Sequence, residues 1–410
     1  MGYVPLRSVD GINRSSTKVV SKQTIIHPLK VPKSQRRRSK RTIVYALVAL
    51  LIGLIVGYLG NGHLFNKRPV SKTVVIGIGR QLVNNNNDLG ISAFKQVYPG
   101  QQSVLLSLSG LSMATSLLEQ GNNYHGAKLT ADMKQAYQAL DSYINSLYPN
   151  QLSIKNSLWI KRSDSVPAGF MSIAKKYYLS NVFRVNNLNG NLKQLNNWLA
   201  GNGGGLLPAV SVAGNNTNLF LADASIFKFN WFFRFNNKLT KTANFYLSNG
   251  SFKAVPYLNQ LNTFAYYQNS MLQAVNIPIG ENQNLSMVIF MPSDINSFVT
   301  GLSGASLNNI FDQMVPENVD LFMPKFSLGS NNAFILMPNG TLQPATNSIL
   351  LNQSEIYQES YLDVSSTGYN QAPTESLNGA NIMIINHPFV FAIRDNTTGL
   401  ILFMGSVFNP

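Results

Sequence analysis

Ser172 and Lys175 have the Ser-x-x-Lys spacing of penicillin-binding enzymes. Residues three apart on a helix are neighbours, so the lysine amine could take the proton of the serine hydroxyl and make its oxygen a nucleophile. Those enzymes also carry a Ser-Asp-Asn and a Lys-Thr-Gly segment. This chain has neither, and Lys241-Thr242-Ala243 is the nearest approach. We therefore interpret the Ser172–Lys175 segment as part of an ordinary helix and do not expect an enzyme.

The sequence also lacks the residue patterns that usually bind metals or cofactors. The chain has no cysteine, which excludes disulfides and thiolate ligands. Its four histidines are His27, His63, His125 and His387, and no two of them have metal-ligand spacing. No glycine-rich phosphate loop precedes a Lys-Ser or Lys-Thr pair. We expect no metal and no cofactor, and we expect His387 to be a hydrogen-bonded structural residue.

The elements that position these residues form an α+β pattern, with helices early and strands late. We expect helices within 104–118, over 168–178 and over 195–199, the last ended by the glycines of 201–205. Short apolar runs predict strands at 156–160, 219–226, 285–291 and 319–323, and the Asn249-Gly250 turn predicts a hairpin within 245–255.

The C-terminal segment 386–410 predicts a second hairpin, which is buried. Residues 389–393 and 400–407 are apolar runs rich in β-formers, and Asn396-Thr397-Thr398-Gly399 between them supplies turn residues. Hydrophobic residues make up 45% of the chain, which is ample for one large core.

This C-terminal segment resembles the serpin family's His-Pro-Phe-x-Phe strand, Thr-Gly turn and strand ending in Asn-Pro. Asp223 and Phe229 stand where the family usually has Asn and Gly, and the match fades between 327 and 348. Further segments resemble serpins in the expected order: Asn156-Ser157-Leu158-Trp159, Asn197-Trp198, 221–231, Val255-Pro256, Leu285-Ser286-Met287 and Pro324-Lys325-Phe326. The resemblance covers 73–410 and implies a serpin fold, with a helical N-terminal part packed on a large central sheet, smaller sheets and an exposed reactive loop.

The resemblance also implies how such a protein acts. In the family a protease cleaves the reactive loop and is caught as an acyl-enzyme, and the freed segment inserts into the main sheet as a new strand. Residues 362–364 match the end of a central strand, and the match places the candidate scissile bond at Leu377–Asn378, with Glu375 or Ser376 presented to the protease under another register. The hinge residues implied are Gly368, Tyr369, Asn370, Gln371, Ala372 and Pro373. The inhibitor needs no catalytic residue of its own.

This hinge departs from the family's pattern of Glu, Gly, Thr or Ser and a run of Ala. Strand side chains alternate between faces, so an inserted strand with Tyr369 inward also turns Gln371 and Pro373 inward. Burying an unpaired Gln amide costs about 1–3 kcal/mol, and proline removes a ladder donor. The stretch from Gly368 to Leu377 would extend roughly 30 Å and is shorter than in the family. Two functions stay open, a serine-protease inhibitor of chymotrypsin- or elastase-like enzymes and a non-inhibitory serpin-fold binding module.

The N-terminal part of the sequence predicts a membrane anchor and its orientation across the membrane. Residues 42–60 contain no charged side chain, and as a helix they would span roughly 28 Å. Residues 1–41 hold eleven of the 32 Lys and Arg and one of the 17 Asp and Glu, so this tail carries +10 of the net +15. The Arg36–Arg41 block abuts the apolar run, which places that end in the cytoplasm. A cleaved signal peptide is the alternative, but the tail is long and no Ala-x-Ala follows Gly60.

The sequence thus predicts four segments. They are a disordered basic cytoplasmic tail (1–41), a transmembrane signal-anchor helix (42–60), a tether (61–72) and an extracellular serpin domain (73–410). We expect a single-pass plasma-membrane protein, monomeric, with an extracellular serine protease as its partner and with membrane lipid touching its anchor and basic tail. The remaining charge is too mild for a nucleic-acid partner.

Overall fold

The computed structural model describes residues 79–122, 130–207, 209–210, 219–337, 339–345, 354–372 and 379–410. The chain divides into two compact units, Met1–Lys67 and Arg68–Pro410, and every described residue lies in the second. The predicted tail, anchor and tether lie outside the described residues. Among the helices of the described part, none is both long and apolar enough to cross a membrane.

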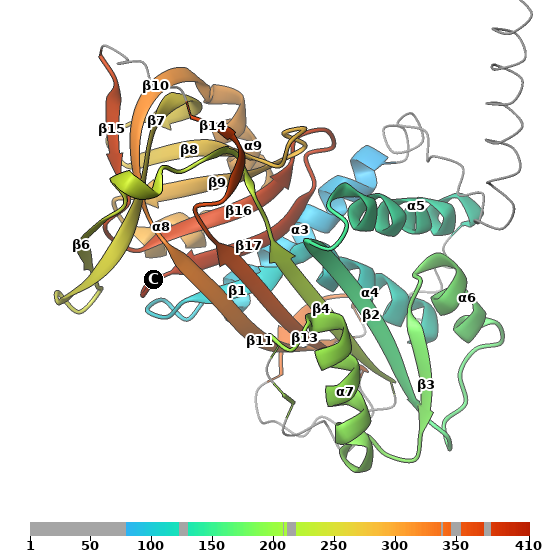
Figure 1. Cartoon of the computed structure of the whole chain (residues 1–410). Coiled ribbons are helices and arrows are strands. Elements are labelled where there is room, and N and C mark those ends of the chain that lie inside the picture. Colours follow the sequence, from blue (N-terminus) through green and yellow to red (C-terminus); the bar gives the residue numbers. More distant parts are fainter. Residues whose placement is uncertain are drawn as a thin grey trace, which may run out of the picture. The chain divides into compact units, whose positions relative to one another are not determined.

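Helices and strands alternate in the first half of the described chain, and strands dominate the second half (Figure 1). The helices are α3 (Gly79–Val97), α4 (Leu108–Asn122), α5 (Ala131–Leu147), α6 (Phe170–Tyr177), α7 (Leu192–Gly203), α8 (Ile295–Thr300) and α9 (Gly304–Gln313), with 3₁₀ turns η2 (Asn189–Asn191) and η3 (Asn237–Leu239). The predicted α+β class is confirmed.

A six-stranded sheet and an eleven-stranded sheet form the scaffold. The smaller sheet has the order β12 (Leu342–Pro344), β11 (Phe326–Leu336), β13 (Ser354–Val364), β4 (Leu219–Lys228), β2 (Leu152–Lys161) and β3 (Asn181–Val185). The larger has the order β1 (Val104–Ser107), β17 (Ile401–Val407), β16 (Phe389–Asp395), β9 (Leu285–Pro292), β8 (Leu272–Ile279), β7 (Phe252–Gln268), β10 (Val315–Pro324) and β15 (Asn381–Ile384). Three strands lie off this order: β5 (Trp231–Arg234) pairs with β8 and with β14 (Gly368–Gln371), and β6 (Lys241–Tyr246) pairs with β7.

The predicted C-terminal hairpin is confirmed as β16 and β17, which pair antiparallel from Phe389 opposite Val407. Its two strands lie inside the larger sheet, because β17 also pairs with β1 and β16 with β9. Nearly every residue of both strands is buried, which explains why the two runs are continuously apolar and do not alternate. The hairpin predicted at Asn249-Gly250 is also confirmed, between β6 and β7.

The helix predicted at 195–199 is longer than expected. Helix α7 runs from Leu192 through Gly201 to Gly203, and Gly204 ends it in the left-handed conformation, with its N–H donating to the Ala200 carbonyl. The two internal glycines do not break the helix, because its apolar stripe of Leu195, Trp198 and Leu199 packs against a second core cluster. Tertiary packing therefore outweighs glycine's low helix propensity here.

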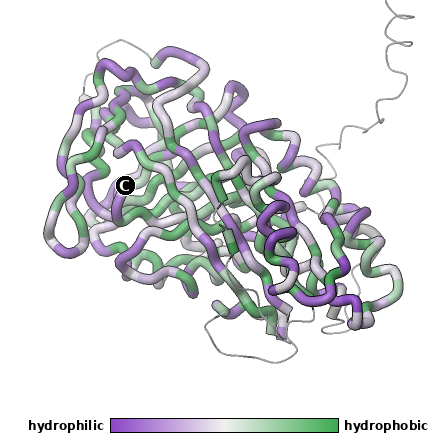
Figure 2. Tube along the Cα trace, turned by 60° about the horizontal axis from the view of Figure 1, so that its bottom comes forward, coloured by the Kyte–Doolittle hydropathy of each residue, from purple (hydrophilic) through white to green (hydrophobic). Residues whose placement is uncertain are grey.

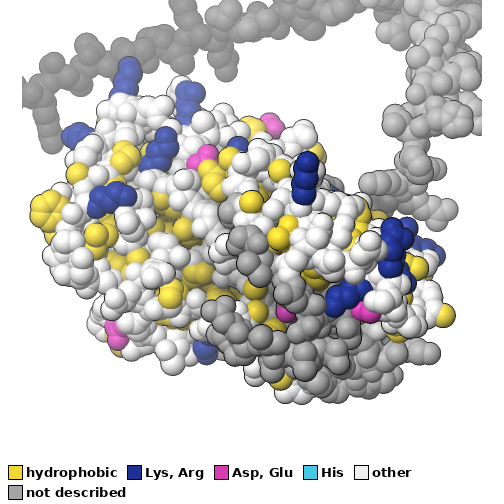
Figure 3. All heavy atoms as spheres, turned by 90° about the horizontal axis from the view of Figure 1, so that it is seen from below, with side chains coloured by type: hydrophobic (Ala, Val, Ile, Leu, Met, Phe, Trp, Pro, Cys, Tyr) yellow, Lys and Arg dark blue, Asp and Glu magenta, His cyan; other side chains and the backbone are white. Residues whose placement is uncertain are grey.

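The two faces of the smaller sheet have different coverings (Figure 1). We call the face toward α4 the inner face and the face toward α7 the outer face. Figure 2 shows apolar residues concentrated along the central strands and polar residues toward the periphery. Charged side chains are spread over the face shown in Figure 3 among many uncharged ones, in keeping with a charged content of 12%.

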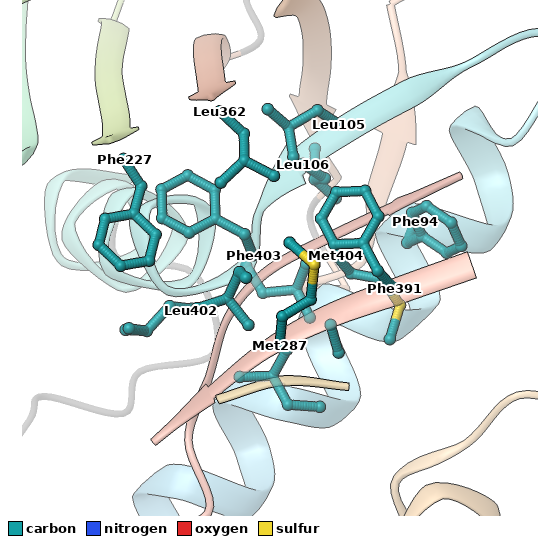
Figure 4. Packing of buried hydrophobic residues seen from close by; sticks show 14 of the residues in the cluster. Phe94, Leu105, Leu106, Phe227, Met287, Leu362, Phe391, Leu402, Phe403 and Met404 are labelled. Carbon is teal, nitrogen blue, oxygen red and sulfur yellow. The ribbon is translucent and has the colours of Figure 1, made fainter. Parts of the chain in front are cut away.

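The main core lies between the inner face and the C-terminal hairpin (Figure 4). Phe227 of β4, Leu362 of β13 and Leu105 of β1 converge there on Phe391 and Phe403 of the hairpin. The rings of Phe227 and Phe403 are stacked, with centroids 6.1 Å apart. The hairpin thus joins the two sheets through one buried contact surface.

Replacing Phe403 with alanine tests this joint. Because the ring is fully buried between both sheets, we expect Phe403→Ala to lower the free energy of unfolding by about 3–5 kcal/mol. Chemical denaturation of the full-length chain measures the change. Phe252→Ala serves as the control, since that ring is 61% exposed and its removal should change stability by less than about 0.5 kcal/mol. Equal losses in the two variants would contradict the proposed joint.

Candidate functional site

Strands β13 and β4 are parallel neighbours, and we call their paired residues, 355–363 and 220–228, the seam. The register runs without interruption from Glu355 opposite Phe220 to Asp363 opposite Lys228. The sequence prediction that residues 362–364 end a central strand is confirmed, because β13 ends at Val364. The seam is therefore closed along nine residue pairs, and the hinge begins directly at its end.

The inner face of the seam is apolar at its ends and polar in its middle. Ile356 and Leu221 form one apolar end, and Leu362 and Phe227 form the other. Between them Gln358 lies opposite Asp223, and Ser360 lies opposite Ser225. All four of these polar side chains are buried.

Gln358 fixes the middle of β13 to the junction of β1 and α4. Its Oε1 accepts a hydrogen bond from the Ser107 N–H (3.0 Å), and its Nε2 donates to the Ser107 carbonyl (2.8 Å). Next to it, Asn332 of β11 donates to the Leu105 carbonyl at 3.0 Å. Because both amide groups are buried and paired with backbone, separating β13 from the core would leave unsatisfied polar groups.

Asp223 is the buried acid of the inner face. Its Oδ1 accepts a hydrogen bond from Ser225 Oγ at 2.7 Å, while Oδ2 has no partner among the described residues. Burial raises the pKa of this carboxyl to about 7, and its hydrogen bonds with Ser225 and Gln358 offset part of the rise. Gly110 of α4 makes room for it, since a Cβ there would lie 2.4 Å from Oδ2.

Glu359 is a second buried acid at the same level, on the outer face. It lies opposite Ala224 of β4 and Asn331 of β11 and has no exposed surface, and neither carboxylate oxygen has a hydrogen-bond partner among the described residues. Burial raises its pKa to about 7, and the neighbouring Tyr357 hydroxyl offsets part of that rise. Neither Gln358 nor Glu359 was expected from the sequence as a site residue. The available signal was a run of polar residues, Gln358-Glu359-Ser360, inside an otherwise alternating strand.

The described part of the hinge, 368–372, and the residues 365–367 that lead into it do not leave the fold as a free loop; we include 365–367 in the hinge from here on. Residues 368–371 form strand β14, which pairs parallel with β5. The Trp231 N–H donates to the Thr367 carbonyl at 2.9 Å, and the Phe235 N–H donates to the Ser366 carbonyl at 3.1 Å. Residues 368–371, which the sequence places in the hinge, are therefore exposed but paired, because backbone groups of β5 are available to this polar segment.

Side chains strengthen this docking. Trp231 Nε1 donates to the Ser365 carbonyl at 2.7 Å, and Thr367 Oγ1 donates to Asn230 Oδ1 at 2.7 Å. Gly368 lies so close to β5 that a Cβ would be 2.4 Å from the backbone nitrogen of Arg234. The glycine that the sequence marks as the hinge thus also permits this close backbone approach.

The other predicted site residues follow Gly368 in the chain. Tyr369 is 41% exposed, and its hydroxyl accepts a hydrogen bond from Gln151 Nε2 at 3.2 Å. Asn370 donates from Nδ2 to the Phe232 carbonyl at 3.2 Å, and Gln371 is exposed. Ala372 is half-buried and ends the described part of the loop. Pro373, Glu375, Ser376, Leu377 and Asn378 lie outside the described residues.

The residues considered for other chemistry are dispersed. Ser172 and Lys175 are both exposed on α6. His387 is half-buried beside Asn386, with 3.0 Å between its Nδ1 and Asn386 Oδ1, and burial lowers its pKa. Within the described ranges, no three His, Cys, Asp or Glu side chains lie close enough together to hold a metal ion.

Several known proteins are similar to this chain in sequence or in fold. Leukocyte elastase inhibitor of Xenopus tropicalis is 26% identical over 80% of this chain and 95% of its own length. A serpin-like protein of Thermococcus kodakarensis is 25% identical over 90% of this chain and 99% of its own length. Among solved structures, native protease nexin-1 with heparin has a TM-score of 0.67 at 22% identity, covering 80% of this chain and 99% of its own. The thermophilic serpin Tengpin in its native state has a TM-score of 0.68 at 18% identity, covering 80% and 94%.

These structural likenesses show a common fold. The family model for serpins, serine protease inhibitors, matches residues 84–410, which is most of the chain and includes both the seam and the hinge. The predicted resemblance is confirmed, and this chain belongs to the serpin family.

Proposed function

We propose that this serpin inhibits a serine protease outside the cell by inserting its cleaved loop into the seam. The observation that carries the proposal is the seam itself, closed along nine pairs with the hinge starting at one end of it. Residues 369–377 are also nine in number, so an inserted strand that starts after Gly368 is long enough to pair along the whole seam, roughly 30 Å. The similarity to leukocyte elastase inhibitor supports a target of the elastase type.

The chemistry of trapping uses the protease's own residues. The protease serine oxygen bonds to the carbonyl carbon of the residue before the cleaved bond, and the C–N bond then breaks. The new amine takes a proton from the protease histidine. We place this bond at Leu377–Asn378. Insertion of the freed strand into the seam would carry the acyl-linked protease away before water completes hydrolysis.

A non-inhibitory binding module is the second candidate, favoured by the docked hinge. Insertion must first break the hydrogen bonds that hold residues 365–371 on β5. It must then place Pro373 in the sheet, where it offers no ladder donor. A docked hinge opposes insertion thermodynamically, and new ladder bonds along the seam would have to offset that cost.

The two candidate functions predict different products when the chain is incubated with a protease. We expect the full-length chain, incubated with elastase- and chymotrypsin-like enzymes, to form a complex that survives denaturing electrophoresis. Cleaved protein should also melt at a much higher temperature than intact protein. Cleavage without a complex and without a rise in melting temperature would support the binding module.

A matched pair of hinge variants controls for the mechanism. With Tyr369 inward, Gln371 faces the core of an inserted strand, whereas Ala372 faces the other side. An unpaired buried guanidinium is costly, so Gln371→Arg should convert an inhibitor into a substrate, whereas Gln371→Ala, which buries neither a charge nor an amide, should keep complex formation. Equal behaviour of the two variants would argue against insertion in this register.

Gly368→Ala tests the docking of β14 on β5. A Cβ at 2.4 Å from the Arg234 backbone nitrogen should push the hinge off β5. We therefore expect the Trp231 and Phe235 amides, which donate to the hinge, to lose protection in hydrogen-exchange measurements. Gly201→Ala is the control, because no atom lies within 4 Å of its added methyl group and alanine favours the helix. Unchanged protection in Gly368→Ala would show that the hinge tolerates the methyl group.

We further propose that the apolar run 42–60 holds the protein in the plasma membrane, with the tail of 1–41 inside and the serpin domain outside. The charge asymmetry of the tail supports this orientation. Full-length protein should stay in the membrane fraction after carbonate washing, and deletion of 42–60 should release it. Protease added to intact cells should digest the serpin domain and spare the tail. Release of the unaltered chain by carbonate would contradict the anchor.

A further inference from the structure

Two buried acids lie at the same level of the seam and on opposite faces of it. Asp223 of β4 is opposite Gln358, and the next pair along the register is Ala224 with Glu359 of β13. Successive strand residues point to opposite faces, so Asp223 faces α4 while Glu359 faces the α7 side. Both side chains are fully buried. An ionised carboxylate at each position would be costly, because neither has a cationic partner among the described residues to offset its desolvation.

The surroundings of Asp223 favour a neutral carboxyl. Asn156 of β2 is directly opposite Asp223 and is buried, and its Oδ1 has no partner in the described part of the chain. Opposite residues of an antiparallel pair have Cβ atoms about 5 Å apart, so Asp223 and Asn156 are neighbours, and each has an oxygen without a hydrogen-bond partner among the described residues. Two acceptors side by side repel, whereas a proton on Oδ2 converts Asp223 into a donor to Asn156. The residue of α4 that faces Asp223 is Gly110, and the residue of β13 that faces it is Gln358. Neither is charged.

The residues around Glu359 are uncharged, with Asn331 of β11 opposite it on one side and Ala224 of β4 on the other. Tyr357 and Tyr361 flank it along β13, and Ala224 separates it from Lys155, which lies opposite Ala224 on β2. The other charged residues on these strands are farther along: Glu355, Asp363 opposite Lys228, and Lys161 at the end of β2. On α7 the charged residue is Lys193, near the N-terminal end of the helix. None of these cations forms a hydrogen bond to Glu359 in the described part of the structure.

We propose that protons on Asp223 and Glu359 hold the seam shut and that proton loss loosens it, which makes the seam a pH-sensitive gate. The part of this proposal that concerns loop insertion rests on the proposed inhibitory function. The gate itself needs no protease and is tested on the intact protein.

The direction of the pH effect follows from the two carboxyl groups. Burial raises the pKa of each to about 7 in the closed sheet, against about 4 in an open or unfolded chain. The closed form then binds more protons than the open form between about pH 4 and 7. Its stability is highest at the acidic end, falls as the pH rises through that window, and levels off above the raised pKa.

The direct test uses infrared spectroscopy of the full-length protein. At pH 5.5 the wild type should show absorption of buried protonated carboxyl groups, which Asp223→Asn and Glu359→Gln should each reduce and their combination remove. A wild-type protein without this absorption would overturn the proposal. That result would mean that the Asn156 amide turns its NH₂ group toward an ionised Asp223.

The second test measures how the stability of the seam changes with pH. Hydrogen-exchange protection factors of β4 and β13 amides should fall at least about tenfold in the wild type between pH 5.5 and 8, because each unit of pKa difference is worth a factor of ten. The Asp223→Asn, Glu359→Gln double variant should lose this fall and melt at a higher temperature than the wild type at pH 8. The matched control is Glu355→Gln, Asp363→Asn, which removes the same charges from half-buried positions of β13 and should keep the wild-type profile.

The outcomes separate this inference from the proposed function. If protection of the seam depends on pH but the protein traps no protease, the pH-sensitive gate is supported and only the inhibitory function is rejected. A pH-independent seam in a protein that traps proteases would reject only the gate.

Discussion

The pairing of β4 with β13 is the contact on which the rest of the structure depends. Its nine pairs join one half of the smaller sheet to the other and form the support for two cores, one on each face. Opening it would expose Leu362 and Phe227 on the inner side and Tyr361 and Ile226 on the outer side. A large, cysteine-free domain can rely on such a contact because its burial is extensive.

The two apolar ends of the seam contribute more stability than its polar middle, which we call the weak middle. Apolar pairs at both ends gain stability from burial, whereas the middle contains polar groups whose hydrogen bonds contribute little net energy and cost much if lost. The Gln358–Ser107 contacts satisfy one such group, and Asp223 is satisfied only in part. On the proposed mechanism the cleaved loop would enter at this weak middle, so the residues that limit stability would also permit the rearrangement.

The hinge has two competing partners within one molecule. In the uncleaved state its backbone pairs with β5, and in an inserted state it would pair with β4 and β13. Gly368 matters to the first arrangement because it allows close contact with Arg234. Under the proposed function, the balance between these two partners would decide whether the chain traps a protease or only presents a loop.

The amino-acid sequence by itself determined the α+β class, the C-terminal hairpin and the family, because buried strands such as 389–393 and 400–407 carry a continuous apolar pattern that is local. It also placed the end of β13 at Val364. It did not reveal strand β14, since Gly368–Gln371 is polar and without periodicity and becomes a strand only through a partner more than 130 residues away in the chain. Likewise α7 continues through Gly201 only because its stripe packs on the sheet. The buried state of Asp223 and Glu359 was decided by tertiary structure alone, because burial depends on which segments cover a side chain and not on its neighbours in sequence.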